Sequence, residues 1–477
     1  MISLNYFRSP LRTGAKNNSV GAYRHAPLLF ASLFHAIFVI GLIVRFNFVG
    51  YAAETQSPSA DGLTPSGLSL DLTETLKLAE KRHIEVLLAD ERVKQAVARL
   101  GQARSVLFPQ IHAASSQYRE TRNLEANGIK LPQTSPLVGP FNSFDARLTL
   151  TQSLFDLEAL NRLKAAQADR KLSEAQRLQV RQDVLALAAN LFVEAKRAED
   201  QLRVQASFVK RDRENYRVLR ARRKNGSAAQ TELLTAKRDL RESRYRYRQA
   251  RTAFIEKRLD LTAALGFEAG TPLSLREQKL NEFPFSTREE TKAALESHPE
   301  MEAVRQLTRA RKAEHWAELA QRFPKISGLA DYGASGATPA TPEQTYAIGV
   351  KASLPLFEGG RRIFGGRSAQ SAVRESENRA QDTRLELAAR AGTALAKLRE
   401  ARALIRVKNA EIAVLKAQWA VSKTRYSEGA GSHLELTQML SARFAAEDER
   451  SEALALYAVA QVNLAHALGK MDYFLEK

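Results

Sequence analysis

The stretch Ser105-Val106-Leu107-Phe108-Pro109-Gln110-Ile111 decides the fold, because it returns later in the chain as Ala320-Gln321-Arg322-Phe323-Pro324-Lys325-Ile326. The two prolines are 215 positions apart (324 − 109), and His83 and His298 have the same offset (298 − 83). Further on, Gly226 returns as Gly429 and Gly266 as Gly469, at an offset of 203 (429 − 226 and 469 − 266). Such long units exceed a solenoid repeat of about 20–50 residues. The chain is therefore predicted to contain two internal repeats of one architecture.

The period of the apolar residues changes at each Phe-Pro pair. Residues 71–108 have helical spacing and are predicted to form one helix, which Pro109 ends because proline cannot continue the hydrogen-bond ladder. After the pair, apolar and polar residues alternate around Ala146 and around Val350. Each repeat should supply two strands of about ten residues, the length at which a tilted strand crosses a bilayer. A half-buried soluble hairpin would show the same alternation.

Residues 1–53 have the features of an export signal. Basic residues precede an apolar run at 26–44, and Gly50-Tyr51-Ala52-Ala53 suits cleavage after Ala52 or Ala53. An uncleaved signal anchor is the alternative, since the run reaches spanning length. Residues 54–70, rich in Ser, Pro, Thr and Gly, are predicted to be a flexible lead. The chain has no cysteine, which excludes disulfides, thiolate metal sites and a lipid-anchored N-terminal Cys.

Very long helices are expected after the strands, because no proline occurs from 141 to 271 or from 356 to the end. The predicted helices span 157–224, 228–265, 362–427 and 434–468. The first would be about 100 Å long at 1.5 Å per residue, which demands coiled-coil-like packing. Its apolar residues form two adjacent stripes, one through Val184 and Leu191 and one through Leu185, Ala189 and Phe192. Two stripes predict neighbours on both sides of the helix.

A short glycine-containing turn joins the two long helices of each repeat. Gly226 and Gly429 stand where a left-handed C-cap is wanted, and Ser227 and Ser432 are placed as N-caps for the helices that follow.

The segment Leu354-Pro355-Leu356-Phe357-Glu358-Gly359-Gly360-Arg361 resembles a motif of the TolC-like outer membrane efflux proteins, in which a barrel strand passes into a long periplasmic helix. Pro355 would end strand pairing, and the glycine pair would permit the change of direction. The resemblance covers about residues 68–470. In the first copy Ser153-Leu154-Phe155-Asp156-Leu157-Glu158 lacks the proline and both glycines, so that bend should be made differently.

The resemblance implies a mainly α protein with a small transmembrane β part, in which a long-helix α-barrel tunnel continues a trimeric 12-stranded β-barrel. Each chain would contribute four strands, since open strand edges are not tolerated in lipid and four strands cannot close a barrel. Repeat 1 would occupy 71–270, with its β-hairpin at about 110–155. A linker or equatorial segment would follow at 271–286, and repeat 2 would occupy 287–477, with its hairpin at about 325–357.

The resemblance also implies a function and partners. The expected protein is a homotrimeric exit duct in the cell outer membrane, in contact with its lipid, with a periplasmic helical tunnel. It would conduct solutes or polypeptides passively in a tripartite efflux or type I secretion system, docked to a periplasmic adaptor (membrane fusion protein) and an inner-membrane pump. The cargo, the particular pump and adaptor, and the ion selectivity of the closed end stay open. An exported coiled-coil scaffold without a membrane barrel is the alternative.

Site residues are implied at the turns between the long helices. Arg425 and Tyr426 are possible gate residues, and no cluster of acidic residues precedes Gly429. The expected adaptor-docking residues are Asn225, Gly226, Ser227, Gly429, Ala430, Gly431 and Ser432.

Other chemistries find little support in the sequence. The 8 histidines are scattered without His-Glu-x-x-His spacing, so no metal site, cofactor or enzymatic activity is expected. The basic segment 237–251 superficially resembles a nucleic-acid surface, but Asp239 and Glu242 interrupt it and an exported helix has little access to nucleic acid. A solvated or partner-facing helix is expected instead. The net charge of +19 fits acidic partners, anionic lipid or simple solvation of long helices, and solvation is expected to account for most of it.

Overall fold

The computed structural model describes residues 68–129, 135–268, 270–276, 283, 288–428, 430 and 433–475. The predicted export signal at 1–53 lies outside these residues, as do most of the predicted lead and most of the segment 277–287. None of the helices in the described ranges combines the length and the apolar character needed to cross a membrane.

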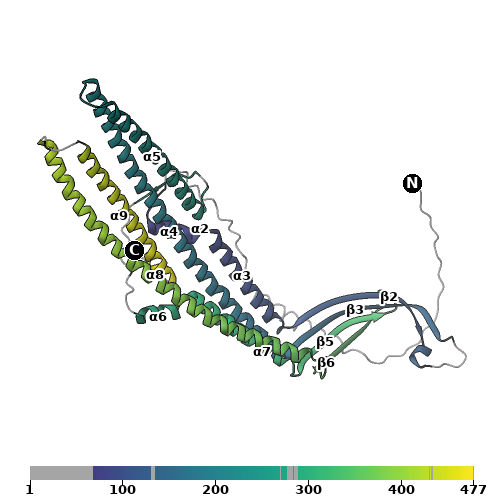
Figure 1. Ribbon diagram of the computed structural model, residues 1–477. Helices are drawn as coiled ribbons and strands as arrows, with labels where there is room; N and C mark the ends of the chain where they lie inside the picture. The colour runs from purple at the N-terminus through teal and green to yellow at the C-terminus, as the bar shows by residue number, and fades with distance from the viewer. Residues whose placement is uncertain are drawn as a thin grey trace, which may run out of the picture. The chain divides into compact units, whose positions relative to one another are not determined.

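The described elements follow the same order in both halves of the chain (Figure 1). The first half contains α2 (Leu72–Arg82), α3 (Ile84–Ser105), β2 (Gln110–Asn123), β3 (Leu137–Phe155), α4 (Leu157–Lys224) and α5 (Gln230–Ala264). The second half contains α6 (Arg288–Glu296), α7 (Pro299–Ala320), β5 (Lys325–Gly336), β6 (Glu343–Ser353), α8 (Arg361–Ser427) and α9 (His433–Ala467). The four long helices begin and end within two residues of their predicted bounds, which confirms them.

The prediction of one helix over 71–108 was wrong, because the chain breaks at His83. This residue has extended backbone (φ −63°, ψ 129°) and ends α2, and its side chain accepts a hydrogen bond from the Glu85 amide at the start of α3. His298 has nearly the same backbone (φ −61°, ψ 136°) and accepts from the Glu300 amide before α7. The histidines at matched positions of the two repeats are therefore both N-caps.

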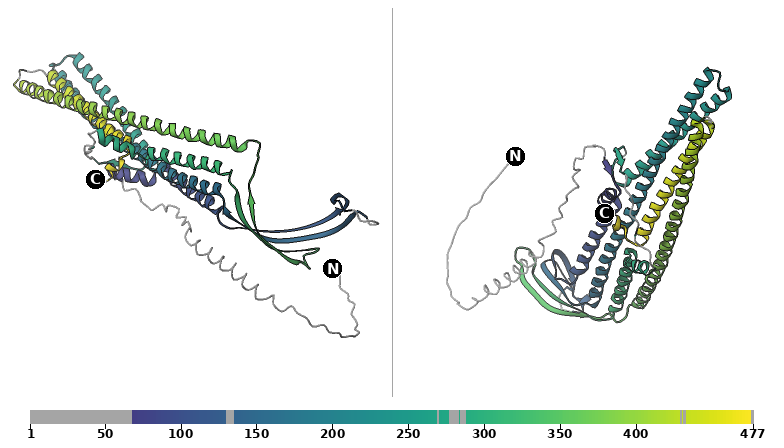
Figure 2. Two further views of the ribbon diagram at one scale, coloured as in Figure 1. Left: turned by 90° about the horizontal axis from the view of Figure 1, so that it is seen from below. Right: turned by 90° about the vertical axis from the view of Figure 1, so that its left-hand side faces the viewer.

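The four main strands form one antiparallel sheet in the order β2-β3-β5-β6. The first hairpin has the predicted bounds of 110 and 155, but its strands of 14 and 19 residues are longer than predicted, against 12 and 11 in the second hairpin. The second hairpin ends at Ser353, not at 357, because the residues before Pro355 leave the ladder. All four junctions with helices, from α3 and α7 and into α4 and α8, occur at one end of the sheet (Figure 2).

The helices form a layer whose members change along its length. Beside the sheet, α4 packs against α3 and α7, and α7 packs against α8. Further along, α4 packs against α5 and α9, and α9 packs against α8. Helix α4 therefore has neighbours on both sides, as its two stripes predicted, and each level is four helices wide, like the sheet.

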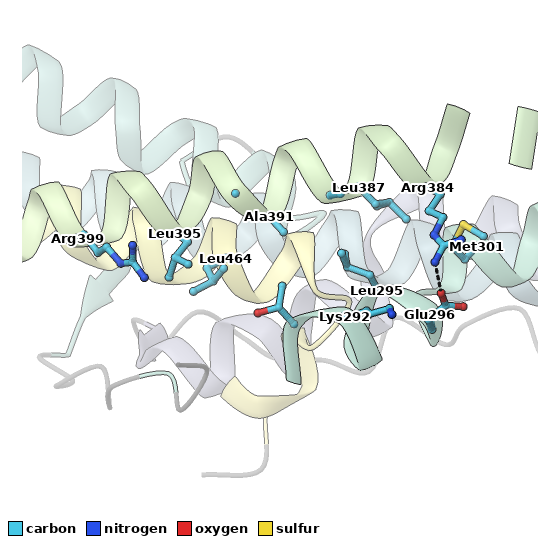
Figure 3. A pocket seen from close by; sticks show the side chains of 13 residues that line it. Lys292, Leu295, Glu296, Met301, Arg384, Leu387, Ala391, Leu395, Arg399 and Leu464 are labelled. Carbon is cyan, nitrogen blue, oxygen red and sulfur yellow. Dashed lines mark hydrogen bonds and ion pairs between the residues drawn. The ribbon is translucent and has the colours of Figure 1, made fainter. Parts of the chain in front are cut away.

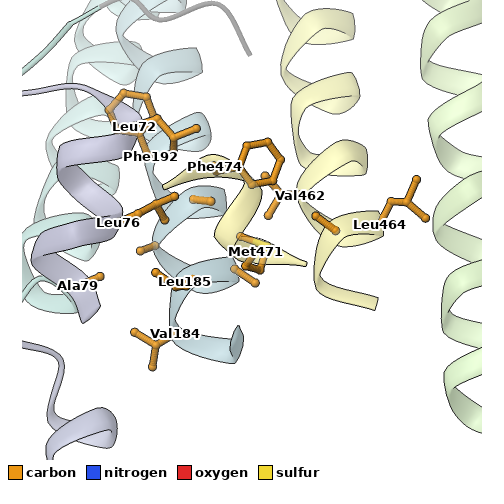
Figure 4. Packing of buried hydrophobic residues seen from close by; sticks show 14 of the residues in the cluster. Leu72, Leu76, Ala79, Val184, Leu185, Phe192, Val462, Leu464, Met471 and Phe474 are labelled. Atoms are coloured by element: carbon orange, nitrogen blue, oxygen red, sulfur yellow. The ribbon is translucent and has the colours of Figure 1, made fainter. Parts of the chain in front are cut away.

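The core lies where the two levels meet (Figure 4). Leu76 from α2, Leu185 from α4, and Val462 from α9 are each fully buried there together with Met471, from the 3₁₀ turn η2 (Met471–Phe474). Two short strands, β1 (Leu68–Leu70) and β4 (Leu273–Leu275), pair in parallel beside this core. The end of the predicted lead at 54–70 is thus a strand, and β4 lies within the predicted linker or equatorial segment at 271–286; burial of Leu70, Leu273 and Leu275 favours both strands.

Candidate functional site

One face of the sheet is mostly apolar on β3, β5 and β6 and at the start of β2. Leu148 on β3 lies opposite Ala113 on β2 and Tyr332 on β5, and Tyr332 lies opposite Tyr346 on β6. Residues directly opposite each other share a face, and so do residues two apart on a strand. The same face therefore carries Ile111, Ala146, Leu150, Ala330, Ile348 and Val350. On the edge strand β6, Tyr346, Ile348 and Val350 are 77%, 80% and 71% exposed. This face suits immersion in an apolar medium.

The opposite face is polar, and Arg147 ties three strands together on it. Its guanidinium donates to Asp145 on its own strand at 2.9 Å, to Asp331 on β5 at 2.7 Å and to Thr345 on β6 at 3.3 Å. Gly333 lies under this side chain, since a Cβ there would stand 2.6 Å from Arg147 Cγ. The arginine thus lies flat along the polar face. Charged and apolar residues are separated between the two faces, as expected of a wall between water and lipid.

Both edges of the four-wide assembly are open. Within the described part of the chain, β2 and β6 are each paired on one side only, so each leaves a row of backbone groups without a strand partner there. On the same side as β6, α8 exposes Val407, Val414 and Val421 to 60%, 56% and 60%. Their spacing of seven residues places the three valines on one stripe of the helix. An apolar stripe on a helix at the same edge as an unpaired strand is typical of an edge that another chain covers.

The first of the two turns predicted to dock an adaptor closes α4 with a regular cap. Asn225 is the C-cap, and Gly226 has a left-handed backbone (φ 75°). The Ser227 amide donates to Arg222 O at 2.8 Å and the Gly226 amide to Arg223 O at 3.1 Å, the two bonds of a Schellman motif. The left-handed conformation expected at Gly226 is confirmed, at the position directly after the C-cap. Ser227 is not the N-cap of α5: that helix begins at Gln230, and the carboxylate of Glu232 accepts from the Ala229 amide instead.

The second docking turn repeats the outer bond of the first. The Ala430 amide donates to Arg425 O at 2.9 Å, and Glu428 is the C-cap of α8. Ala430 is exposed. The predicted site residues Gly429, Gly431 and Ser432 lie outside the described residues.

The possible gate residues lie in the last turn of α8. Arg425 lies 3.8 Å from the carboxylate of Glu435 on α9, which also accepts a hydrogen bond from Ser422 at 3.1 Å. Tyr426 follows at a half-buried position. The link between Glu435 and Ser422 was not found from the sequence. The two residues are 13 apart across a turn, so helix periodicity on one helix gave no signal.

The two passages from strand to helix use different chemistry. Between β6 and α8, Gly359 and Gly360 have left-handed φ values of 59° and 84°, while Pro355 and Phe357 lie in the preceding irregular segment. Hydrogen bonds from Arg361 and then Arg362 lower the pKa of Glu358 at this bend. Between β3 and α4 only Asp156 intervenes, and its carboxylate accepts from the Ala159 amide at 2.9 Å.

A cavity of about 630 Å³ lies between α6 and α8 (Figure 3). Leu295, Leu387 and Leu395 supply apolar surface, and Arg384 pairs with Glu296 at 3.0 Å at its rim. Its described lining contains no pairing of a nucleophile with a general base. Nor do the described ranges hold a group of three His, Asp or Glu residues able to bind a metal ion. The sheet and the helix tips therefore remain the parts with functional geometry.

Comparison with known proteins identifies the family. The model of the outer membrane efflux protein family matches residues 75–267 and 291–470. The chain is 25% identical over 357 residues to the alkaline protease secretion protein AprF of Pseudomonas aeruginosa, covering 70% of this chain and 71% of AprF. It is 27% identical over 444 residues to protein CyaE of Bordetella pertussis, covering 88% and 90%.

The fold is shared with solved outer membrane channels. The CmeC outer membrane channel of Campylobacter jejuni superposes with a TM-score of 0.74 at 19% identity, over 84% of this chain and 85% of CmeC. The TolC-like fold expected from the bend motif is thereby confirmed, with its helical tunnel and β-barrel parts. The chain belongs to the outer membrane efflux protein family, and it is an outer-membrane exit duct with a periplasmic helical tunnel.

Proposed function

We propose that three copies of the chain close edge to edge into one duct, with a barrel of 12 strands above a tunnel of helices. The observation that carries this is the shared width: the sheet and both helix levels are each four elements wide, with open edges. Three copies would pair β6 of one chain with β2 of the next and satisfy both rows of backbone groups. In lipid, an open edge of this kind costs several kcal/mol per unsatisfied group.

The two faces of the sheet support the same arrangement. In a closed barrel the apolar face with Leu148 and Ile348 would contact lipid, and the face with Arg147 would line the water-filled lumen. The valine stripe of α8, at Val407, Val414 and Val421, would be covered by the neighbouring chain.

Native mass spectrometry of the purified protein in mild detergent tests the assembly. The expected result is a trimer of the mature chain, which conducts ions when inserted into planar bilayers. A detergent-free, monomeric and soluble protein would overturn the proposal.

The tips would dock a periplasmic adaptor that couples the duct to an inner-membrane pump. The docking residues are Asn225, Gly226 and Ser227 on one hairpin, and Gly429, Ala430, Gly431 and Ser432 on the other. Ala430→Trp is a clean test, because this residue is exposed and its side chain supports no described contact. Export should fall severalfold while the trimer persists, whereas Ala430→Ser should export normally. Equal export by both variants would remove the docking role.

Arg425 and Tyr426 would act near the closed end. The Arg425–Glu435 pair joins the last turn of α8 to the first turn of α9, so its loss should loosen the hairpin. Glu435→Gln should raise the conductance of the resting channel. Unchanged conductance would leave Arg425 as an ordinary surface residue.

Polypeptide is the proposed cargo, as in type I secretion. The support is the name of AprF, which assigns that relative to secretion of alkaline protease. Deleting the gene for this chain from its host should remove particular secreted proteins from the culture medium. Unchanged secretion with a new sensitivity to small toxic compounds would favour solute efflux instead.

A further inference from the structure

The two helical hairpins that form the tips differ sharply in charge. Residues 203–251, the outer parts of α4 and α5, contain 16 Lys or Arg and 5 Asp or Glu, a net charge of +11. The equivalent residues 406–454 of α8 and α9 contain 7 of each, a net charge of zero. The first hairpin therefore holds more than half of the chain's +19. Solvation of long helices does not explain this contrast, since both hairpins are equally long.

The excess charge is arranged in rows. On α5 the row advances by four and three residues alternately, the step that keeps side chains on one stripe of a helix. All its members are exposed, and none forms an ion pair among the described residues. It consists of Lys237, Arg241, Arg244, Arg248 and Arg251. Two acidic residues within the span of the row pair with arginines outside it, Asp239 with Arg238 and Glu242 with Arg246.

A second row follows the same spacing on α4. It consists of Lys210, Arg213, Arg217, Arg220 and Lys224, all exposed. Only Arg217 in it has an ion-pair partner among the described residues, Glu214 at 2.7 Å. The buried side of α5 is, by contrast, a seam of small residues, with Ala236, Ser243 and Ala250 seven apart. The basic rows are thus not part of the packing between the helices of one chain.

A second copy of the chain does not neutralise these rows. The neighbouring edge in a trimer is α8, whose hairpin has no acidic surplus and whose exposed stripe holds valines. Three copies would carry a charge of +33 at the tip end (3 × 11). Uncompensated charge of this density repels itself and attracts a partner of opposite sign. Rows at helical spacing match an acidic helix better than a flat anionic surface.

We propose that the α4–α5 hairpin is the principal docking surface and that its partner is an acidic helical segment of the periplasmic adaptor. The three basic hairpins of a trimer would each bind one acidic helix, and the three neutral α8–α9 hairpins would bind differently. The inference rests on the proposed trimeric duct, and it specifies the chemistry of the partner and the choice between the two tips. Charge would speed encounter and set specificity, and salt would weaken binding.

Charge reversal of the α5 row tests the proposal. The variant carries Arg241→Glu, Arg244→Glu and Arg248→Glu. The matched control carries Arg399→Glu, Arg406→Glu and Lys416→Glu, three exposed α8 residues without a described ion pair, so the change in net charge is the same. Native mass spectrometry should find a trimer in both. The probe is a synthetic helical peptide with a row of glutamates at alternating spacings of three and four residues, measured by fluorescence anisotropy against the full-length trimer.

The α5 variant should bind the peptide at least about tenfold more weakly than the control, as expected from three exposed charge pairs. Export in the host should fall in the α5 variant and persist in the control. An equal loss of peptide binding in both variants would overturn the inference in favour of unspecific attraction to anions. The same conclusion would follow if the wild type bound phosphatidylglycerol vesicles as strongly as it binds the peptide. A wild type that neither trimerises nor exports would instead refute the duct itself.

Discussion

Helices α5 and α9 occupy equivalent places in the two halves and are both 35 residues long, yet their surroundings differ. Helix α5 packs along one side, on α4, and carries nine Lys or Arg residues. Helix α9 lies between α4 and α8 and carries two. The inner end of α9 contributes Val462 and Leu464 to the core, and Leu468, the residue after the helix, packs there too. The duplicated framework is therefore kept by both halves, while position in the layer decides which helix is free to present charge.

The largest effect on stability should come from exchanging the residues that α5 and α9 carry at one equivalent position. Gln461 of α9 is fully buried, whereas its counterpart Arg258 in α5 is half-exposed (461 − 203). Gln461→Arg places an unpaired charge in the core and should cost on the order of 3–5 kcal/mol of the free energy of unfolding. Arg258→Gln should change it by no more than about 0.5 kcal/mol. Thermal denaturation of the purified trimer measures both.

A third substitution at this position controls for disturbed packing. The side-chain amide of Gln461 has no hydrogen-bond partner among the described residues. Gln461→Leu removes a buried unsatisfied amide and should raise stability by about 1–3 kcal/mol. Destabilisation by Leu as well as by Arg would mean that the amide is satisfied, and would weaken the contrast with α5.

The next largest effect on stability is expected from replacing the two capping histidines. His298 is buried, and the chain just after α9 packs on it, since a Cβ on Gly469 would stand 3.0 Å from the His298 ring. His298→Ala should lose both the cap and the packing, about 2–4 kcal/mol. His83→Ala loses mainly a cap, about 1 kcal/mol. Urea denaturation compares the two variants, and equal losses would show that burial adds nothing in the second half.

Substitutions at the two strand-to-helix bends should differ less in the stability that they cost. Gly360→Val forces a branched residue into a left-handed backbone and brings its Cβ within 3.2 Å of the Phe364 ring, at a cost of about 1–3 kcal/mol. Asp156→Ala removes the cap of α4 and should cost about 1 kcal/mol. Melting temperatures of the trimer measure the difference. Gly360→Asn and Asp156→Asn serve as conservative controls, because asparagine tolerates the left-handed region and also caps helices.

The smallest effect is a dependence of stability on pH that arises in the second half. Burial lowers the pKa of His298. At a pH between this lowered pKa and the ordinary value of about 6.5, His298 is protonated in the unfolded chain but neutral in the folded chain. The stability contributed by the neutral ring is thus present above about pH 6.5 and declines as the pH falls below it. Melting curves at pH 7.5 and pH 5.5 should show a smaller decline in His298→Asn, which keeps a cap without titrating.

The periodic parts of the chain could be predicted from sequence, and the parts set by contacts between distant residues could not. The four long helices follow from unbroken stripes and the absence of proline, and the alternation near Ala146 and Val350 predicted the strands. The break at His83 could not be found this way, because the apolar spacing runs through it. It depends on the end of α5, where a Cβ on Gly266 would stand 3.2 Å from Arg82 O.

The candidate site shows the same division. Glycine at 226 predicted its own left-handed cap, since the conformation is a property of one residue. The Arg147 network could not be read from the chain, because it depends on a register that brings Asp331 and Thr345 from other strands to one side chain. From the sequence alone, the alternation around Asp145 and Arg147 predicts only that both side chains lie on the polar face of the sheet.

The order of the amino acids alone determined the duplication, the lengths of the helices, the two faces of each strand and the basic rows of α4 and α5, because each is a periodicity within one element. Tertiary structure decided that α9 is enclosed while α5 stays at an edge, and that Leu70 and Leu273 pair as strands. Those outcomes depend on which segments meet, and burial energy rather than local preference selects them.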